Sequence, residues 1–231
     1  AGELPGHLAT PVTPGPWPGV VVIHEVFGMN DDIRQSADRL AAAGYLTLAP
    51  DLYGWGSTPR CLQATFRSLL SGHGRAYDDI EGARQALARR DDCTGRVGVI
   101  GFCMGGGFAL LAATRGFDAA APCYGPLPKD LKARLAGACP VVASYGGRDR
   151  GLRGAAGRLQ RGLEAAGVEH DVREYPDAGH SFLNRHDLGP FRVLERVAGL
   201  GYHHPSAEDA WRRILTFFGT HLEESRAGDR A

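Results

Sequence analysis

Apolar and polar residues alternate along this chain in blocks that predict strands and helices in turn. The run Val20-Val21-Val22-Ile23 is continuously apolar, as expected for a central strand that is buried on both faces. From Asp31 to Ala43 the apolar residues recur at helical spacing, and Gly44 follows where a helix should end. The same reasoning predicts strands at 45–49, 96–100, 119–124, 141–145 and 170–175, and helices at 77–90, 106–113, 154–166 and from Ser206 to about 218.

This alternation predicts an α/β fold with a mainly parallel sheet and helices on both faces. The length of 231 residues is ordinary for one such domain. We therefore expect a single domain over 1–231, with its core between about 18 and 221. Residues 54–76 depart from the pattern, because glycines and prolines surround a short helix-like piece from Leu62 to Leu70. This segment is predicted to be a mobile excursion near the functional site, which in such folds lies at the ends of the strands.

Composition narrows the classes of partner. Lys plus Arg equals Asp plus Glu at 26 each, and the basic residues form no long run. Such a balance disfavours binding to nucleic acid or to a membrane surface. No segment approaches the roughly 20 apolar residues of a membrane span, and the first residues do not resemble a secretory signal. We expect a cytoplasmic monomer that acts on a small molecule.

The cysteines do not follow the pattern of a disulfide framework or of a zinc site, because there are five of them and no Cys-x-x-Cys pair. We expect reduced thiols. Two of them, Cys123 and Cys139, adjoin apolar strand-like runs and are predicted to be small buried side chains.

The segment Gly101-Phe102-Cys103-Met104-Gly105 has the pattern of a nucleophile elbow with cysteine as the nucleophile. A strand is predicted before it and a helix after it, so Cys103 falls on the turn between them. The flanking glycines allow a strained backbone, and the start of the helix aims N–H groups that favour a thiolate and a developing oxyanion. A tight turn around a buried thiol would show the same pattern, so other residues must distinguish the two.

A cysteine nucleophile needs a base within hydrogen-bond reach and a third group that orients the base. Asp149 follows one predicted strand and His180 follows the next. The carboxyl ends of parallel strands meet at one edge of a sheet, where sites are built. Each residue alone has a structural explanation, since an aspartate after Gly-Gly often caps a loop. The order Cys103, Asp149, His180 is the order of the catalytic triad in α/β-hydrolases.

Four segments together resemble the dienelactone hydrolase family, the carboxymethylenebutenolidase-like α/β-hydrolases. They are His24-Glu25-Val26-Phe27-Gly28, Ala49-Pro50-Asp51-Leu52-Tyr53, Gly101-Phe102-Cys103-Met104-Gly105-Gly106 and Gly179-His180-Ser181-Phe182. With the pattern of strands and helices, the resemblance covers about residues 18 to 221.

The resemblance implies a carboxylic ester hydrolase in which Cys103 is the nucleophile, His180 the base and Asp149 its orienting acid. The backbone N–H groups of Met104 and Val26 would form the oxyanion hole. The implied reaction cleaves a lactone or small ester through an acyl-thioester and requires no metal or organic cofactor.

The resemblance also implies that Glu25 contacts the resting thiol and is displaced when substrate binds. A carboxylate beside a thiol raises the pKa of that thiol, which would keep an idle cysteine unreactive. A salt-bridged residue at the end of a strand is the structural alternative for Glu25.

The residues that select the substrate in this family are matched less closely in this sequence than the catalytic residues are. The family holds an anionic lactone with one arginine after the second strand and another four residues after the histidine. In the first region Arg60 or Arg67 could serve, whereas the second position is Asn184, with Arg185 one residue further. Further candidate substrate-binding residues are Tyr124, which could equally be a packed aromatic, Ser181, Arg150 and Arg153.

Two other functions fit the same residues. One is a broad short-chain esterase or thioesterase, which an uncharged pocket would favour. The other is a redox-responsive or binding protein on a hydrolase scaffold, in which Cys103 is oxidised and no turnover occurs, since thiolate character and exposure also govern oxidation.

Overall fold

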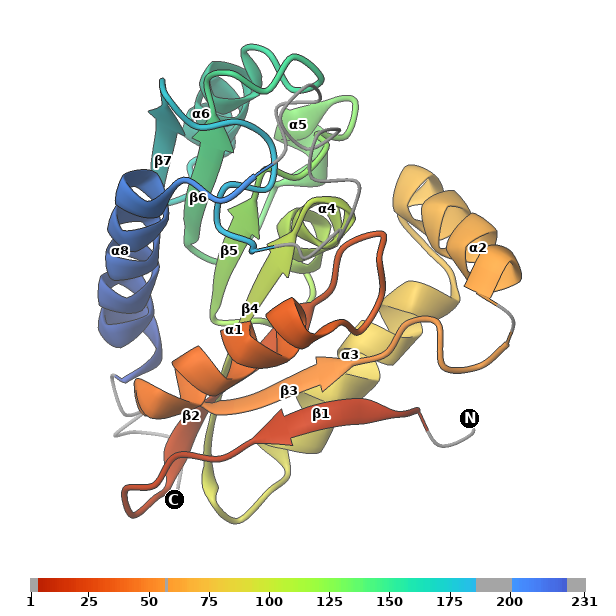
Figure 1. Cartoon of the computed structure of the whole chain (residues 1–231), viewed down its shortest axis with the longest axis vertical. Coiled ribbons are helices and arrows are strands. Elements are labelled where there is room, and N and C mark those ends of the chain that lie inside the picture. The colour runs from red at the N-terminus through yellow and green to blue at the C-terminus, as the bar shows by residue number, and fades with distance from the viewer. Residues whose placement is uncertain (1–3, 57, 186–200, 224–231) are drawn as a thin grey trace.

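The computed structural model describes residues 4–56, 58–185 and 201–223. Within them, a seven-stranded sheet has the order β1-β3-β2-β4-β5-β6-β7 (Figure 1). Strand β1 is antiparallel to β3, and every other neighbouring pair is parallel, which confirms the predicted sheet. The strands are β1 Gly6–Ala9, β2 Trp17–Ile23, β3 Leu46–Pro50, β4 Cys93–Phe102, β5 Ala119–Cys123, β6 Val141–Gly146 and β7 His170–Tyr175.

Helices cover both faces of the sheet, and Figure 1 shows α1 and α3 on opposite sides of β2 and β3. Val20 and Val22 of β2 pack on the side of α1 and α8, whereas Val21 and Ile23 pack on the side of α3, α4 and α6. Because successive residues of a strand face opposite ways, two covered faces produce the continuous apolar run. The helices are α1 Asp31–Ala42, α2 Thr58–Ser71, α3 Arg75–Ala88, α4 Met104–Ala112, α5 Leu131–Arg134, α6 Ala155–Ala166 and α8 His204–Leu222.

The structure differs from the sequence prediction near residues 54–76. The short piece predicted from Leu62 to Leu70 is the longer helix α2, which begins at Thr58. Pro59 indicates a loop when read alone, but proline is well tolerated in the first turn of a helix, where the N–H groups have no intrahelical acceptor. The predicted mobility of the excursion stays a prediction.

The two ends of the chain also differ from the prediction. Strand β1 was not predicted, because its four residues carry no clear apolar pattern and join the sheet through backbone pairing with β3. Helix α8 begins at His204, so Ser206 lies in its first turn instead of capping it, and the Ser206 hydroxyl contacts His203 Nδ1 at 2.8 Å.

All five cysteines are free thiols. Cys123 is completely buried as predicted, and Cys139 is half-buried. In the part of the chain that the structure describes, no helix is both long and apolar enough to cross a membrane.

His24, which directly follows β2, ties the carboxyl ends of β2 and β3 together. The side chain is fully buried, and the backbone N–H of Leu52 donates to its Nε2 at 3.1 Å. Nδ1 therefore carries the proton and donates to the Glu25 carbonyl at 2.7 Å. Burial lowers the pKa of His24, although the hydrogen bond to Glu25 and the charges of Asp51 and Glu25 oppose that effect. The imidazole is thus a neutral structural link beside Glu25.

Because the folded protein disfavours protonated His24, we expect the free energy of unfolding to fall as the pH drops below about 6.5, where the unfolded chain takes up this proton. His24→Asn would leave the buried Leu52 N–H unpaired and should cost about 1–3 kcal/mol at pH 8. The variant should also lose less additional stability than the parent between pH 7 and pH 5. Urea unfolding of both proteins across this range measures the difference, and equal losses would contradict the assignment.

Candidate active site

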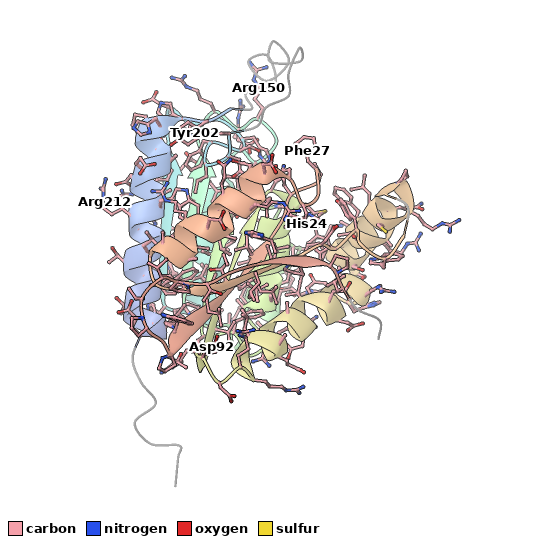
Figure 2. The ribbon with its side chains drawn as sticks, turned by 60° about the horizontal axis from the view of Figure 1, so that its bottom comes forward. His24, Phe27, Asp92, Arg150, Tyr202 and Arg212 are labelled. Carbon is pink, nitrogen blue, oxygen red and sulfur yellow. The ribbon has the colours of Figure 1, made fainter. Side chains whose placement is uncertain are left out.

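The predicted site residues follow the carboxyl ends of four parallel strands, which meet at one edge of the sheet. In Figure 2, Phe27, which follows β2, lies at this end of the molecule, and Asp92, which precedes β4, lies at the opposite end. The residues at the strand ends are Glu25 after β2, Cys103 after β4, Asp149 after β6 and His180 after β7.

Cys103 stands on a strained turn between β4 and α4, with φ 53° and ψ −116°. A Cβ atom at Gly101 would lie 2.0 Å from the carbonyl oxygen of Gly105, and one at Gly105 would lie 2.3 Å from that of Ile23. The turn can therefore form only with glycine at both positions. The Cys103 N–H donates to the Cys123 carbonyl at 3.1 Å, which ties the turn to β5. Such a backbone conformation costs about 1–3 kcal/mol, and its surroundings must enforce it.

Asp149 and His180 are directly hydrogen-bonded, with 2.6 Å between Oδ2 and Nδ1. The other oxygen of Asp149 accepts the backbone N–H groups of Gly151 at 2.9 Å and Leu152 at 3.2 Å. Burial would raise the pKa of Asp149, but the hydrogen bond and charge of His180 and these two backbone donors lower it. The carboxylate is thus ionised and held in a fixed orientation towards the imidazole.

His180 also interacts electrostatically with the half-buried Cys103, and this interaction contributes to the pKa of the imidazole. Burial acts to lower the pKa of His180, but the hydrogen bonds and charges of Asp149 and Cys103 outweigh it and raise that pKa to about 10. Since Nδ1 faces Asp149, Nε2 is the nitrogen left for the thiol. The structure therefore brings together the three residues predicted from their strand-end positions.

Glu25 is buried, with 1% of its surface exposed, and its Oε1 accepts a hydrogen bond from Asn30 Nδ2 at 3.2 Å. Asn30 also caps α1, because its Oδ1 accepts the Ile33 N–H at 3.0 Å. The helix thus helps to fix the carboxylate. The contact between Glu25 and the Cys103 thiol stays a prediction.

The two predicted oxyanion-hole segments are linked by Tyr53. Met104 is the first residue of α4, so its backbone N–H has no acceptor within the helix. The Tyr53 hydroxyl donates to the Val26 carbonyl at 3.2 Å and lies 3.8 Å from Met104 Sδ. These contacts of the Tyr53 hydroxyl were not predicted, although Tyr53 belongs to one of the segments that carry the family resemblance.

The candidate arginines are exposed to solvent. Arg60 and Arg67 are exposed on α2. Arg185 is exposed, stacks over the Tyr202 ring at 4.3 Å, and donates its backbone N–H to Asp32 Oδ1 at 3.0 Å. Arg150 and Arg153 are also exposed, and Figure 2 shows Arg150 at the same end of the molecule as Phe27.

Tyr124 is a fully buried residue packed against the base, and not an open pocket residue. Its ring meets that of His180 edge to face, with centroids 5.2 Å apart, and its hydroxyl donates to Asn184 Oδ1. Ser181 is also buried, and its carbonyl accepts the Asn184 N–H at 3.0 Å. Sequence reasoning noted Asn184 only as the place where an arginine is missing. Among the described residues, no three His, Cys, Asp or Glu side chains are grouped as metal ligands would be.

Known proteins resemble this chain in sequence and in fold. The model of the dienelactone hydrolase family matches residues 4–222. The chain is 31% identical over 237 residues to a protein of Escherichia coli (strain K12) named "Putative carboxymethylenebutenolidase", and the match covers 94% of this chain and 82% of that protein. A protein of Synechocystis sp. with the same name is 30% identical over 244 residues, which cover 96% and 93% of the two chains.

A solved structure described as a "Putative Dienelactone Hydrolase" from Klebsiella pneumoniae superposes with a TM-score of 0.70 at 25% identity, over 94% of this chain and 99% of that chain. The family match, the full-length relatives and the shared fold therefore agree with one another. The chain belongs to the dienelactone hydrolase family of α/β-fold hydrolases.

Proposed function

We propose that this protein is a cysteine hydrolase that cleaves a lactone or small carboxylic ester through an acyl-thioester. The observation that carries the proposal is the hydrogen bond between Asp149 and His180, together with the electrostatic interaction of His180 with Cys103, which stands on a strained turn at a helix start. The names of the relatives, which describe carboxymethylenebutenolidases, support a lactone as substrate.

In the first half of the reaction, the thiolate of Cys103 attacks the carbonyl carbon while His180 holds the proton. A C–S bond forms, and the carbonyl electron pair moves to oxygen, where the N–H groups of Met104 and Val26 would stabilise the negative charge. The intermediate then collapses, the C–O bond breaks, and the leaving alkoxide takes the proton from His180. For a lactone, the released alcohol stays attached to the acyl group.

In the second half, neutral His180 removes a proton from water as the water oxygen attacks the thioester carbon. The C–S bond breaks, the acid is released, and the proton on His180 returns to the Cys103 sulfur, which restores the resting thiol. The raised pKa of His180 suits the ring to take up that proton again when the next substrate displaces Glu25. Asp149 holds the ring and stabilises its positive charge throughout.

A broad short-chain esterase is the second candidate. It is favoured by the exposed positions of Arg60 and Arg67 and by the neutral Asn184, which is buried near the base. A carboxylate-bearing substrate would need a cation near the reacting atoms, whereas a neutral ester would not.

Cys103→Ala should abolish turnover of both a dienelactone and a neutral short-chain aryl ester, with kcat/KM falling by roughly 10³-fold or more, because it removes the proposed nucleophile, which interacts with His180. Cys93→Ala, which removes a buried thiol at the start of β4, is the matched control and should keep its activity. Ultraviolet-followed hydrolysis measures both substrates. Retained turnover in Cys103→Ala would contradict the proposal, and no turnover in the parent would favour the redox or binding function.

Asp149→Asn should lower kcat/KM by roughly 10²–10⁴-fold, because it removes the charge that stabilises protonated His180 and can leave the ring in the wrong tautomer. The pKa of His180 should fall from about 10 towards its ordinary value, which the pH dependence of kcat/KM would report. Asp177→Asn, which alters an exposed aspartate paired with Arg148, is the control. Equal effects of the two substitutions would argue against the assigned role of Asp149.

Glu25→Gln should speed the alkylation of resting Cys103 by iodoacetamide at neutral pH if the carboxylate suppresses the thiolate. Peptide mass spectrometry at several times gives the rate, and circular dichroism checks that the fold is intact. An unchanged rate would exclude the gating role of Glu25 while leaving the hydrolytic mechanism standing.

A further inference from the structure

We infer that Tyr124 and Asn184 form a positioning pair that sets the plane of the His180 imidazole, so that Nε2 faces the Cys103 thiol. The inference rests on the proposed function, in which His180 must exchange a proton with Cys103 and with the leaving group. Neither member of the pair needs to touch the substrate for this role.

The backbone of Tyr124 is fixed to the turn that carries the nucleophile. Tyr124 follows β5 directly, has a left-handed φ of 39°, and donates its N–H to the Ser144 carbonyl of β6 at 2.8 Å. The preceding residue, Cys123, accepts the N–H of Cys103. The position from which the Tyr124 side chain starts is therefore set by the same backbone that sets Cys103.

The side chain of Tyr124 then reaches the base. Its ring packs edge to face against His180 at 5.2 Å and against Phe182 at 5.6 Å, both of which lie on the segment after β7. The hydroxyl at the far end of the ring donates to Asn184 Oδ1 on the same segment. A ring that is held at both ends and has no exposed surface cannot turn freely.

His180 needs such a contact because a single hydrogen bond leaves one degree of freedom. The Asp149 carboxylate fixes Nδ1 at 2.6 Å, but a hydrogen bond tolerates a range of angles, so the imidazole can still tilt about its Cβ–Cγ bond. Efficient proton transfer requires the donor and acceptor to be held within about 10–20° of the productive orientation. The Tyr124 ring limits this rotation, and Asn184 limits the movement of Tyr124.

The hydrogen bonding of Asn184 supports this reading. The side chain is 1% exposed, its oxygen accepts from Tyr124, and its Nδ2 has no hydrogen-bond partner within the described residues. A buried donor without a partner destabilises a fold. Asn184 is therefore better explained by the contact of its oxygen with Tyr124 than by a contribution to stability.

A double-mutant cycle tests the pair. Tyr124→Phe keeps the ring and removes the hydroxyl, Asn184→Ala removes the acceptor, and the double variant removes both. Each variant should lower kcat for 4-nitrophenyl acetate by about tenfold and leave KM unchanged, because the proton transfer and not binding is impaired. The double variant should be no worse than the poorer single variant, since all three lose the same hydrogen bond.

A second readout does not depend on turnover. The rate of Cys103 alkylation by iodoacetamide is measured against pH, and the titratable groups that the described residues bring against the imidazole are Asp149, Cys103 and Tyr124. All three variants should lower the rate at pH 7 and match the parent at pH 10, because a misaligned ring no longer supports the thiolate. Tyr175→Phe is the matched control, since this tyrosine also packs on Phe182 but bonds to Asp209.

A raised KM with unchanged kcat would overturn the inference and assign the pair to substrate binding, and so would additive effects or an alkylation profile like that of the parent. If Asn184→Ala does not fold, Tyr124→Phe alone decides, because it preserves the buried ring. If the parent hydrolyses no ester, the proposed function fails, while the alkylation profile still reports whether the pair orients His180.

Discussion

The close approach of α4 to the end of β2 is the constraint on which the rest of the site depends. Any side chain at position 105 would collide with the Ile23 carbonyl. The helix can therefore begin at this point only if residue 105 is glycine. Every residue of α4 is buried, and this packing holds Cys103 at φ 53° against its local preference. Because Met104 is the first residue of α4, the same turn also fixes the position of the proposed oxyanion-hole donor.

Burial around this turn is tolerated because the polar groups at the strand ends are paired. His24 uses both ring nitrogens, Asp149 uses both carboxylate oxygens, and Glu25 accepts from the residue that caps α1. Burying a polar group costs free energy unless hydrogen bonds within the protein replace those that the group made with water. The same surroundings shift the two pKa values in opposite directions: burial lowers the pKa of His24, whereas Asp149 and Cys103 raise the pKa of His180. Two histidines at one edge of the sheet thus have opposite roles, which follow from their partners.

The elements and site residues that could be predicted are those marked by a short stretch of neighbouring residues in the sequence. β2 shows as an apolar run because both faces of the sheet are covered, and the proposed nucleophile, acid and base show because they follow strands. β1 was missed because backbone pairing selects no residue type, and α2 was shortened because Pro59 suits both a loop and a helix start. The contact between Tyr124 and Asn184 joins residues 60 positions apart, so only the packing of β5 against the segment after β7 reveals it.

Chemistry and substrate selection are carried by different parts of the molecule. The groups proposed for bond cleavage lie at strand ends, where the sheet and the paired polar side chains restrict their movement. The candidate arginines project from α2 and from exposed positions beyond β6 and β7, where few contacts restrict them. We expect a change in these exposed residues to alter the surface charge without disturbing the turn at Cys103 or the orientation of His180. The proposed hydrolytic mechanism therefore rests on residues held at the strand ends, whereas the proposed choice between an anionic lactone and a neutral ester rests on exposed side chains.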